Sequence, residues 1–236
     1  MKAGVLALQG AFREHREVLD ALGVEAVEVR VPEHLGGLDA LFMPGGESTT
    51  IGKLLDTSGL REPLHAALSE GLPAFATCAG LILLADDVRD AGDVAPPPAL
   101  GVLDCTVVRN AYGRQRESFE AGLAVTGIQG DFPGVFIRAP VVEHVGEAVE
   151  VLATHDAHPV LLRQGAIWAA TFHPELSGDL RLHQQFLTEG AAATAALPTV
   201  ARVGGGLADR RSRSGSLRRR PNADEPELAT APKERM

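Results

Sequence analysis

Leu72-Pro73-Ala74-Phe75-Ala76-Thr77-Cys78-Ala79-Gly80-Leu81-Ile82-Leu83-Leu84-Ala85 is the stretch that decides the fold of this chain. The apolar residues after Pro73 predict a buried strand, and the apolar run after Gly80 predicts a helix. Cys78 therefore lies at a predicted turn from strand to helix. Such a turn lifts a side chain clear of the sheet and directs backbone N–H groups toward it, which favours a reactive thiolate. The alternative is a small cysteine buried in the core.

The chain before Cys78 alternates apolar runs of strand length with segments of helical periodicity. Strands are predicted over residues 2–8, 24–31 and 38–43, and helices over residues 12–22, 48–55 and 60–70. Alternation of this kind favours an α/β fold of three layers, in which helices cover both faces of a mostly parallel central sheet.

The pattern changes after a predicted loop at residues 90–99, because short strands then follow one another closely. These strands are predicted over residues 102–108, 119–125, 135–138, 148–154, 160–163 and 167–172. The later ones resemble hairpins, so the C-terminal half is expected to add antiparallel strands. A closing helix is predicted over residues 179–190, with Leu180, Leu182, Phe186 and Leu187 on its inner face.

The composition divides the chain into two unlike regions. Residues 197–236 hold nine Lys and Arg against five Asp and Glu, which leaves 13 basic and 26 acidic side chains in the first 196 residues. An acidic body argues against nucleic acid as its main partner. We predict one domain over residues 1–190 and a disordered, Arg-rich tail over residues 191–236. The alternative for the tail is an arm that binds RNA.

The cysteine content and the N-terminus predict a cytoplasmic protein. Two cysteines, Cys78 and Cys105, do not make a disulfide framework. The apolar run after Lys2 is too short for a signal peptide. We therefore expect neither secretion nor association with a membrane.

A cysteine nucleophile needs a base, and His173 is the strongest candidate among eight histidines. It follows an apolar strand, and Pro174 favours an extended backbone at His173. Residues two apart in an extended segment point the same way, so Glu175 is expected to face the same cleft. A direct contact between the imidazole and this carboxylate is a question of geometry.

The remaining histidines are predicted to have no catalytic role. His15, His65 and His183 are assigned to charged or polar faces of predicted helices, and His34 and His144 to loops. The pair His155 and His158 stands in a predicted turn without a third nitrogen or sulfur ligand close by in sequence, so we expect no metal site there. These two are predicted to be solvated loop residues.

Pro44-Gly45-Gly46-Glu47-Ser48-Thr49-Thr50 follows a predicted strand and begins a predicted helix. Glycines at such a place let backbone N–H groups approach a ligand closely and stabilise an oxyanion. An ordinary helix cap is the alternative. The segment is not a phosphate-binding P-loop, because Glu47 and Leu54 stand where that motif needs Gly and Ser or Thr.

Together these motifs resemble triad-type, class I glutamine amidotransferases. Finer blocks resemble the family of glutaminase subunits of pyridoxal 5'-phosphate synthase, from residue 2 to about residue 190. Besides Pro44–Thr50, these blocks are Leu8-Gln9-Gly10-Ala11, Thr77-Cys78-Ala79-Gly80-Leu81-Ile82, Arg109-Asn110-Ala111-Tyr112-Gly113-Arg114-Gln115, Ser118-Phe119-Glu120, Phe136-Ile137-Arg138-Ala139-Pro140 and Phe172-His173-Pro174-Glu175-Leu176. One departure is Ala76, where the wider family usually has Gly.

The resemblance implies a flavodoxin-like fold and a role for each matching residue. Cys78 is the implied nucleophile, and His173 and Glu175 complete the implied triad. An oxyanion is expected near the backbone of Gly46 and Ala79. The implied contacts to L-glutamine are Gly46, Glu47, Ser48, Arg109, Ile137 and Arg138. No metal and no cofactor are implied.

The resemblance also implies a protein partner, namely the barrel-shaped synthase subunit that consumes the ammonia in a hetero-oligomer. Gln9, Gly10 and Ala11 are the implied contact. In this family the glutaminase is largely inactive until it docks. Two alternatives stay open: a glutaminase that serves another synthase, such as imidazole glycerol phosphate synthase, and a regulatory subunit without catalysis.

Overall fold

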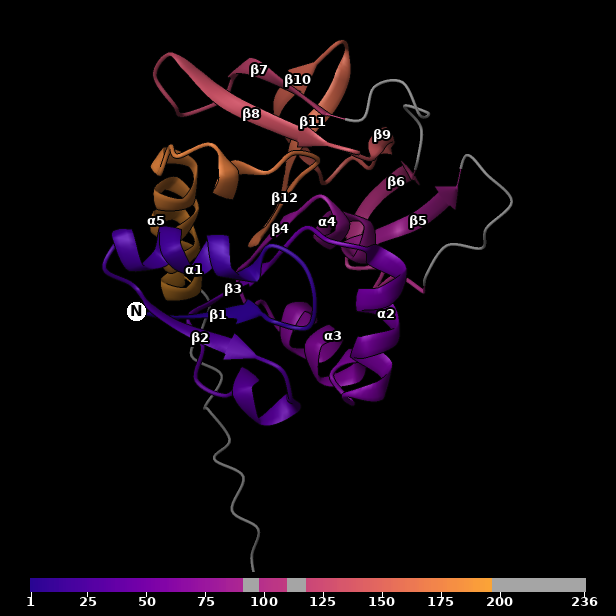
Figure 1. Ribbon diagram of the computed structural model, residues 1–236, viewed down its shortest axis with the longest axis vertical. Helices are drawn as coiled ribbons and strands as arrows, with labels where there is room; N and C mark the ends of the chain where they lie inside the picture. Colours follow the sequence, from indigo (N-terminus) through magenta and orange to yellow (C-terminus); the bar gives the residue numbers. More distant parts are fainter. Residues whose placement is uncertain (91–97, 110–117, 197–236) are drawn as a thin grey trace, which may run out of the picture. The chain divides into compact units, whose positions relative to one another are not determined.

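The computed structural model describes residues 1–90, 98–109 and 118–196. Within them, a seven-stranded sheet in the order β10-β11-β12-β4-β3-β1-β2 forms the centre of the molecule (Figure 1). The strands from β12 to β2 are parallel, and β10 and β11 extend the sheet in antiparallel pairs. The bounds are β1 Lys2–Leu6, β2 Glu25–Val29, β3 Ala40–Met43, β4 Ala74–Thr77, β10 Glu150–His155, β11 His158–Gln164 and β12 Ile167–Ala170.

Helices cover both faces of this sheet, as predicted. The alternation along β3 shows how, since Leu41 and Met43 belong to one buried cluster and Phe42 to the other. The first cluster includes side chains of α2, α3 and α4, and the second includes side chains of α1 and α5. The helices are α1 Phe12–Ala21, α2 Ser48–Thr57, α3 Arg61–Ser69, α4 Ala79–Leu84 and α5 Arg181–Ala196, with short 3-10 turns η1 Pro32–Leu35 and η2 Pro174–Leu176.

Two smaller sheets lie beside the central one. Strands β5, β6 and β9 form one of them, and β7 and β8 form an antiparallel ribbon, drawn at the top of Figure 1. The predicted fold class, a mostly parallel α/β sheet with antiparallel strands in the C-terminal half, is therefore confirmed. The bounds are β5 Ala85–Asp90, β6 Leu103–Arg109, β7 Ser118–Ala124, β8 Asp131–Ile137 and β9 Val141–Val145.

The structure differs from the sequence prediction at several elements. Strands β5 and β9 were not predicted, and β5 reads Ala-Asp-Asp-Val-Arg-Asp. Within the described ranges each of them pairs only with β6, so their outer edges tolerate polar residues. Strand β8 begins at Asp131 instead of residue 135, and α5 ends at Ala196 instead of residue 190. His144 lies in β9 and not in a loop.

Some predictions fall outside the described residues. Most of the predicted loop at residues 90–99, the block at residues 110–115 and the Arg-rich tail from residue 197 onward lie there. The division into a domain of residues 1–190 and a tail of residues 191–236 therefore stays a prediction. Within the described ranges, no helix combines the length and the apolar character that a membrane span needs.

The order of the parallel strands decides where a site can form. Strands β1, β3, β4 and β12 run in the same direction, so the segments that follow them meet at one edge of the sheet. Those segments carry Gln9, the loop at residues 44–47, Cys78 and His173. Most of the residues singled out in the sequence are thus gathered at this edge.

Candidate active site

Cys78 stands on a sharp turn between β4 and α4, as predicted. Its backbone has φ 49° and ψ −102°, a conformation that costs free energy in any residue other than glycine. The N–H of Cys78 donates to the carbonyl of Ala170 (2.8 Å), and its own carbonyl accepts from the N–H of Ile82 (3.2 Å). The strained residue is therefore fixed by the strand before it and the helix after it.

Small residues around Cys78 let α4 approach the sheet closely. A β-carbon at Gly80 would lie 2.3 Å from the carbonyl oxygen of Met43, so a side chain there would clash with β3. Ala76 pairs with β3 and β12 as an ordinary strand residue with negative φ. Alanine at this position therefore introduces no backbone strain into the turn.

His173 and Glu175 contact each other directly. His173 Nδ1 lies 2.7 Å from Glu175 Oε1, and both side chains are buried. The contact arises from the η2 turn that begins at Pro174, and not from an extended segment as the sequence suggested. The His173 N–H also donates to the carbonyl of Val135 (2.8 Å), which ties the segment to β8.

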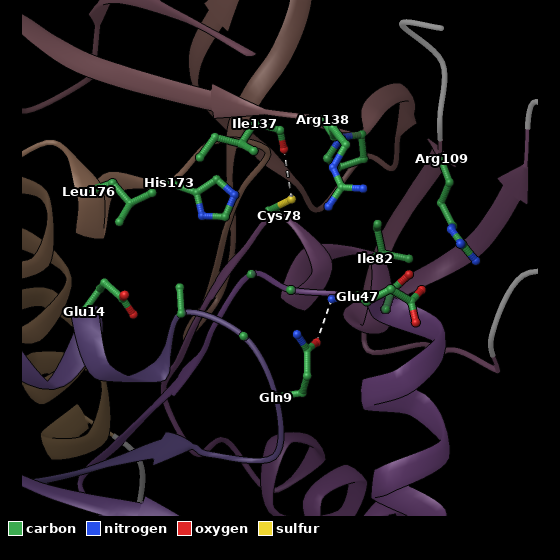
Figure 2. Close-up of a pocket in the computed structure, with 16 residues that line it drawn as sticks. Gln9, Glu14, Glu47, Cys78, Ile82, Arg109, Ile137, Arg138, His173 and Leu176 are labelled. Atoms are coloured by element: carbon green, nitrogen blue, oxygen red, sulfur yellow. Dashed lines mark hydrogen bonds between the residues drawn. The ribbon is translucent and has the colours of Figure 1, made fainter. Parts of the chain in front are cut away.

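The charges of this cluster favour an ionised Glu175 and a protonated His173. Burial raises the pKa of Glu175, but the electrostatic interaction with His15 and the hydrogen bond with His173 outweigh burial and lower it. Burial lowers the pKa of His173, whereas hydrogen bonds and charges of Cys78 and Glu175 raise it to about 10. An imidazolium beside Cys78 stabilises a thiolate. Figure 2 shows the His173 ring next to the sulfur.

The double-glycine loop is held between the ends of β1 and β4. The N–H of Gly45 donates to Thr77 Oγ1 (3.0 Å), and its carbonyl accepts from the N–H of Ala11 (3.0 Å). Gly10 has φ 103°, and a β-carbon there would lie 1.9 Å from the carbonyl oxygen of Gly45. Only glycine at position 10 therefore allows this packing of two backbone segments.

Glu47 is the N-cap residue of α2 and accepts hydrogen bonds from free N–H groups of its first turn. Its carboxylate accepts from the N–H of Thr49 (3.0 Å) and of Thr50 (2.7 Å). Burial raises the pKa of Glu47, but the hydrogen bonds from Thr50 and Thr49 outweigh burial and lower it. The Glu47 N–H donates to the Gln9 side chain (2.7 Å), as Figure 2 shows. The loop is therefore a helix cap as well as part of the cleft wall.

These residues line a cleft of about 350 Å³ around Cys78. It contains all of the predicted substrate and partner residues, whereas Ala79, predicted near the oxyanion, is buried in the turn behind Cys78. Glu175 likewise lies behind His173 and outside the lining. The lining residues are Gln9, Gly10, Ala11, Glu14, Gly45, Gly46, Glu47, Ser48, Cys78, Ile82, Arg109, Ile137, Arg138, Pro140, His173 and Leu176.

Two arginines provide positive charge on the cleft wall. Arg109 at the end of β6 lies 3.6 Å from the Asp90 carboxylate, measured from Nε to Oδ2. Arg138 follows β8 with φ 44°, and Figure 2 shows its side chain reaching into the cleft near Cys78. The carbonyl of Ile137 lies 3.9 Å from the Cys78 sulfur. The end of β8 thus lies against the nucleophile.

Two histidines were misplaced by the sequence interpretation. His15 and His183, assigned to polar helix faces, are completely buried. The sequence does carry a signal for the burial of His15, because this residue lies three positions after Phe12 and four before Leu19, on the apolar side of α1. His183 likewise lies three residues before Phe186 on the inner side of α5. His65 is exposed, as expected.

The other polar residues weighed in the sequence lie away from the cleft. His155 and His158 face each other across a tight turn, where Asp156 and Ala157 have positive φ. His155 stacks on Phe119 and is therefore no free loop side chain. Among the described residues, no three His, Cys, Asp or Glu side chains are arranged to hold a metal ion. Cys105 is buried in β6.

The sequence profile of the SNO glutamine amidotransferase family matches residues 5–191. The chain belongs to this family. Among curated members, the "Pyridoxal 5'-phosphate synthase subunit PdxT" of Dehalococcoides mccartyi is 54% identical over 189 residues, which cover 79% of this chain and 96% of that protein. The protein of the same name from Thermus thermophilus is 57% identical over 187 residues, covering 78% and 95%.

A solved structure of high identity agrees with this assignment. A structure described as a glutamine amidotransferase superposes with a TM-score of 0.74 at 56% identity and covers 80% of this chain and 98% of its own. A chain of PurLQS from Thermotoga maritima superposes with a TM-score of 0.54 at 13% identity, covering 82% and 98%, and shows the shared fold alone. This SNO family member is therefore an enzyme of the glutamine amidotransferase class.

Proposed function

We propose that this chain hydrolyses L-glutamine to L-glutamate and ammonia through a thioester on Cys78. The ammonia passes to a synthase subunit that makes pyridoxal 5'-phosphate. The observation that carries the proposal is the arrangement of Cys78, His173 and Glu175 beside a double-glycine loop. The curated relatives at more than 50% identity, named as subunits of this synthase, support that partner over imidazole glycerol phosphate synthase.

The first half of the reaction forms the thioester and releases ammonia. The Cys78 thiolate attacks the carbon of the side-chain carboxamide, and a C–S bond forms. The imidazolium of His173 gives its proton to the departing nitrogen as the C–N bond breaks, so the leaving group is neutral ammonia. The raised pKa of His173, about 10, means that this proton is present at neutral pH.

The second half of the reaction restores the enzyme. His173, now neutral, takes a proton from a water molecule that attacks the thioester, and the C–S bond breaks to release glutamate. Glu175 holds the imidazole through Nδ1 and stabilises its charged form. In this scheme Glu175 keeps its charge throughout, consistent with the lowered pKa of this carboxyl.

The glycine loop and the turn after Cys78 are proposed to stabilise the oxyanion. Backbone N–H groups of Gly46 and Ala79 are the donors that the scheme needs, because they flank Cys78 from β3 and α4. Glutamine itself is proposed to lie along Gly46, Glu47 and Ser48, with the arginines toward its charged end. The guanidinium of Arg138 reaches into the cleft from its rim and suits a carboxylate.

The product explains why a partner is needed. Ammonia released into water at neutral pH is protonated and loses its nucleophilicity, so the acceptor site must receive it directly. We propose that the synthase subunit docks at Gln9, Gly10 and Ala11 on the rim of the cleft. The Gln9 side chain accepts a hydrogen bond from the Glu47 N–H, and the Ala11 N–H donates to the Gly45 carbonyl. A partner that moves these residues would therefore reposition the loop that carries the oxyanion donor.

The test is a tracer experiment in the reconstituted complex of this chain with the synthase subunit. Glutamine labelled with ¹⁵N in its amide is supplied together with an excess of unlabelled ammonium. The proposal predicts ¹⁵N in the ring nitrogen of pyridoxal 5'-phosphate in spite of the excess. Product that carries only unlabelled nitrogen would show that ammonia from this chain does not reach that synthase.

A further inference from the structure

A row of buried polar groups runs from α5 through α1 to the carboxylate behind His173. His183 Nε2 lies 3.2 Å from His15 Nδ1. His15 Nε2 lies 3.3 Å from Thr77 Oγ1 and 3.6 Å from Glu175 Oε2. Both histidine side chains are fully buried, and the His183 ring stacks on Phe42. The proposed reaction scheme assigns no role to either histidine.

Both imidazoles are neutral at physiological pH. Burial lowers the pKa of His15, although the charge of Glu175 opposes this effect. Burial and the neighbouring His15 lower the pKa of His183 to about 3. A neutral imidazole has one N–H donor and one nitrogen that only accepts. The hydrogen bonds along the row must therefore all run from donor to acceptor in one direction.

The hydrogens available on Thr77, His15 and His183 determine in which direction these hydrogen bonds run. Thr77 Oγ1 accepts from the Gly45 N–H, so its own hydrogen is free to donate to Glu175 Oε1 at 3.4 Å. His15 Nε2 must then carry its hydrogen toward Thr77 and Glu175, because the other tautomer would set a lone pair against a carboxylate oxygen. His15 Nδ1 is thus an acceptor, and His183 Nε2–H is its donor.

Two buried atoms of the row, Glu175 Oε2 and His183 Nδ1, have no hydrogen-bond partner among the described residues, and the second supports this assignment. In the Nε2–H tautomer of His183, Nδ1 carries no hydrogen. The unpaired atom is then an acceptor, and no buried N–H group is left without an acceptor. Every hydrogen in the row points toward Glu175.

We propose that His15 is a positioning residue of the catalytic triad, which holds Glu175 ionised and in place through its Nε2–H while His183 fixes the His15 tautomer. The proposal rests on the proposed function and adds to it a support for Glu175 from helix α1. It also joins two parts of the site, because Thr77 contacts both the carboxylate and the glycine loop. His15 touches no substrate and acts only through Glu175.

Removal of the His15 N–H has a predictable effect on the titration of the site. The ionisable groups near Glu175 are His173 on its own turn, His15 from α1 and His183 behind it, with Cys78 beyond His173 and Glu14 beside His15. A carboxylate that loses the neighbouring N–H dipole, 3.6 Å away, is protonated more easily, and it stabilises the His173 imidazolium less. Both limbs of the pH profile should therefore move inward.

The first test compares His15→Phe and His15→Gln with the wild-type chain in the complex with the synthase subunit. His15→Phe keeps a ring but no donor, so kcat/KM for glutamine hydrolysis should fall about 10- to 100-fold and both limbs should move inward. His15→Gln offers an amide N–H in place of Nε2–H, so its activity and its pH profile should return toward those of the wild-type chain. A wild-type profile in His15→Phe, or equal losses in both variants, would overturn the proposal.

A second measurement does not depend on activity or on a variant that folds. The ¹⁵N shifts of the wild-type chain labelled in histidine report the tautomer of each buried ring. The expected result is a neutral Nε2–H form for both His15 and His183 from pH 6 to 8. A charged His15, or an Nδ1–H form, would overturn the proposal. If both rings hold the neutral Nε2–H form but the wild-type complex releases no glutamate, the proposed function fails instead.

Discussion

Gly45 lies directly against the imidazole of His173. A β-carbon at position 45 would be 2.3 Å from Cε1 of that ring and 3.2 Å from the β-carbon of Cys78. The double-glycine loop therefore does more than expose N–H groups to a ligand, since its lack of side chains leaves room for the ring beside the nucleophile. The loop, the base and the cysteine occupy one shared space.

Gly45→Ala should accordingly displace His173 and lower glutaminase activity by about 100-fold or more, because small displacements of a catalytic group have effects of that size. The matched control is Gly36→Ala, since a β-carbon there meets only the Glu33 carbonyl oxygen at 3.6 Å. Steady-state glutamate release measures both variants in the complex. Equal activity of Gly45→Ala and the control would contradict the close packing at His173.

Thr77→Val tests the hydroxyl that joins the glycine loop to the triad. Valine has the same shape but cannot accept from the Gly45 N–H, so a buried donor loses its partner. The free energy of unfolding should fall by about 1–3 kcal/mol, together with activity. Thr77→Ser keeps the hydroxyl and should stay much closer to wild type in urea unfolding. A Thr77→Val variant as stable as Thr77→Ser would show that the hydrogen bond contributes nothing.

The two cysteines should differ sharply in reactivity. Burial, together with the charges of Asp104 and Asp86, raises the pKa of Cys105 to about 12, so almost no thiolate is present there at neutral pH. Cys78 lies in the cleft beside a protonated imidazole. Iodoacetamide should therefore modify one thiol per native chain, at Cys78, and two after unfolding. Modification of Cys105 at a comparable rate in the native chain would be the opposite result.

Acid should destabilise the fold through its buried neutral histidines. The folded-state pKa of His183 is lowered to about 3, so only the unfolded chain takes up this proton between pH 6.5 and 3, and stability falls as the pH falls. From pH 7.5 to pH 5, this one group should account for about 2 kcal/mol of lost stability.

His183→Phe removes this group while keeping a ring among Phe42, Phe75 and Phe186. Urea unfolding of both chains at the two pH values gives the comparison. The variant should lose about 2 kcal/mol less than wild type between them. Equal losses in the two chains would mean that His183 titrates normally in the folded state.

Local sequence patterns predicted much of the fold and site because each key residue carries a local signal. Cys78 follows a short apolar run and precedes a helical one, and the glycines at 45 and 46 end another strand. Parallel strands then bring these separate turns to one edge. The direct contact between His173 and Glu175 could not be predicted from the strand pattern, because the η2 turn makes this contact and not strand geometry.

What the sequence interpretation missed depends on tertiary packing. Strand β5 carries three acidic residues among six and is held as a strand by its pairing with β6. His15 and His183 are separated by 168 positions in the chain, and their polar character suggested solvent exposure. Only the packing of α1 and α5 on the same face of the sheet shows that each histidine is the hydrogen-bond partner of the other.

The central claim is that Cys78 is the nucleophile of a glutaminase. The most direct measurement is glutamate release from L-glutamine by the wild-type and Cys78→Ala chains, each with saturating synthase subunit, with ammonium-dependent synthesis of pyridoxal 5'-phosphate measured in parallel. We expect release by wild type, a loss of at least about 10³-fold in Cys78→Ala and unchanged synthesis from ammonium. Equal glutamate release by the two chains would contradict this claim.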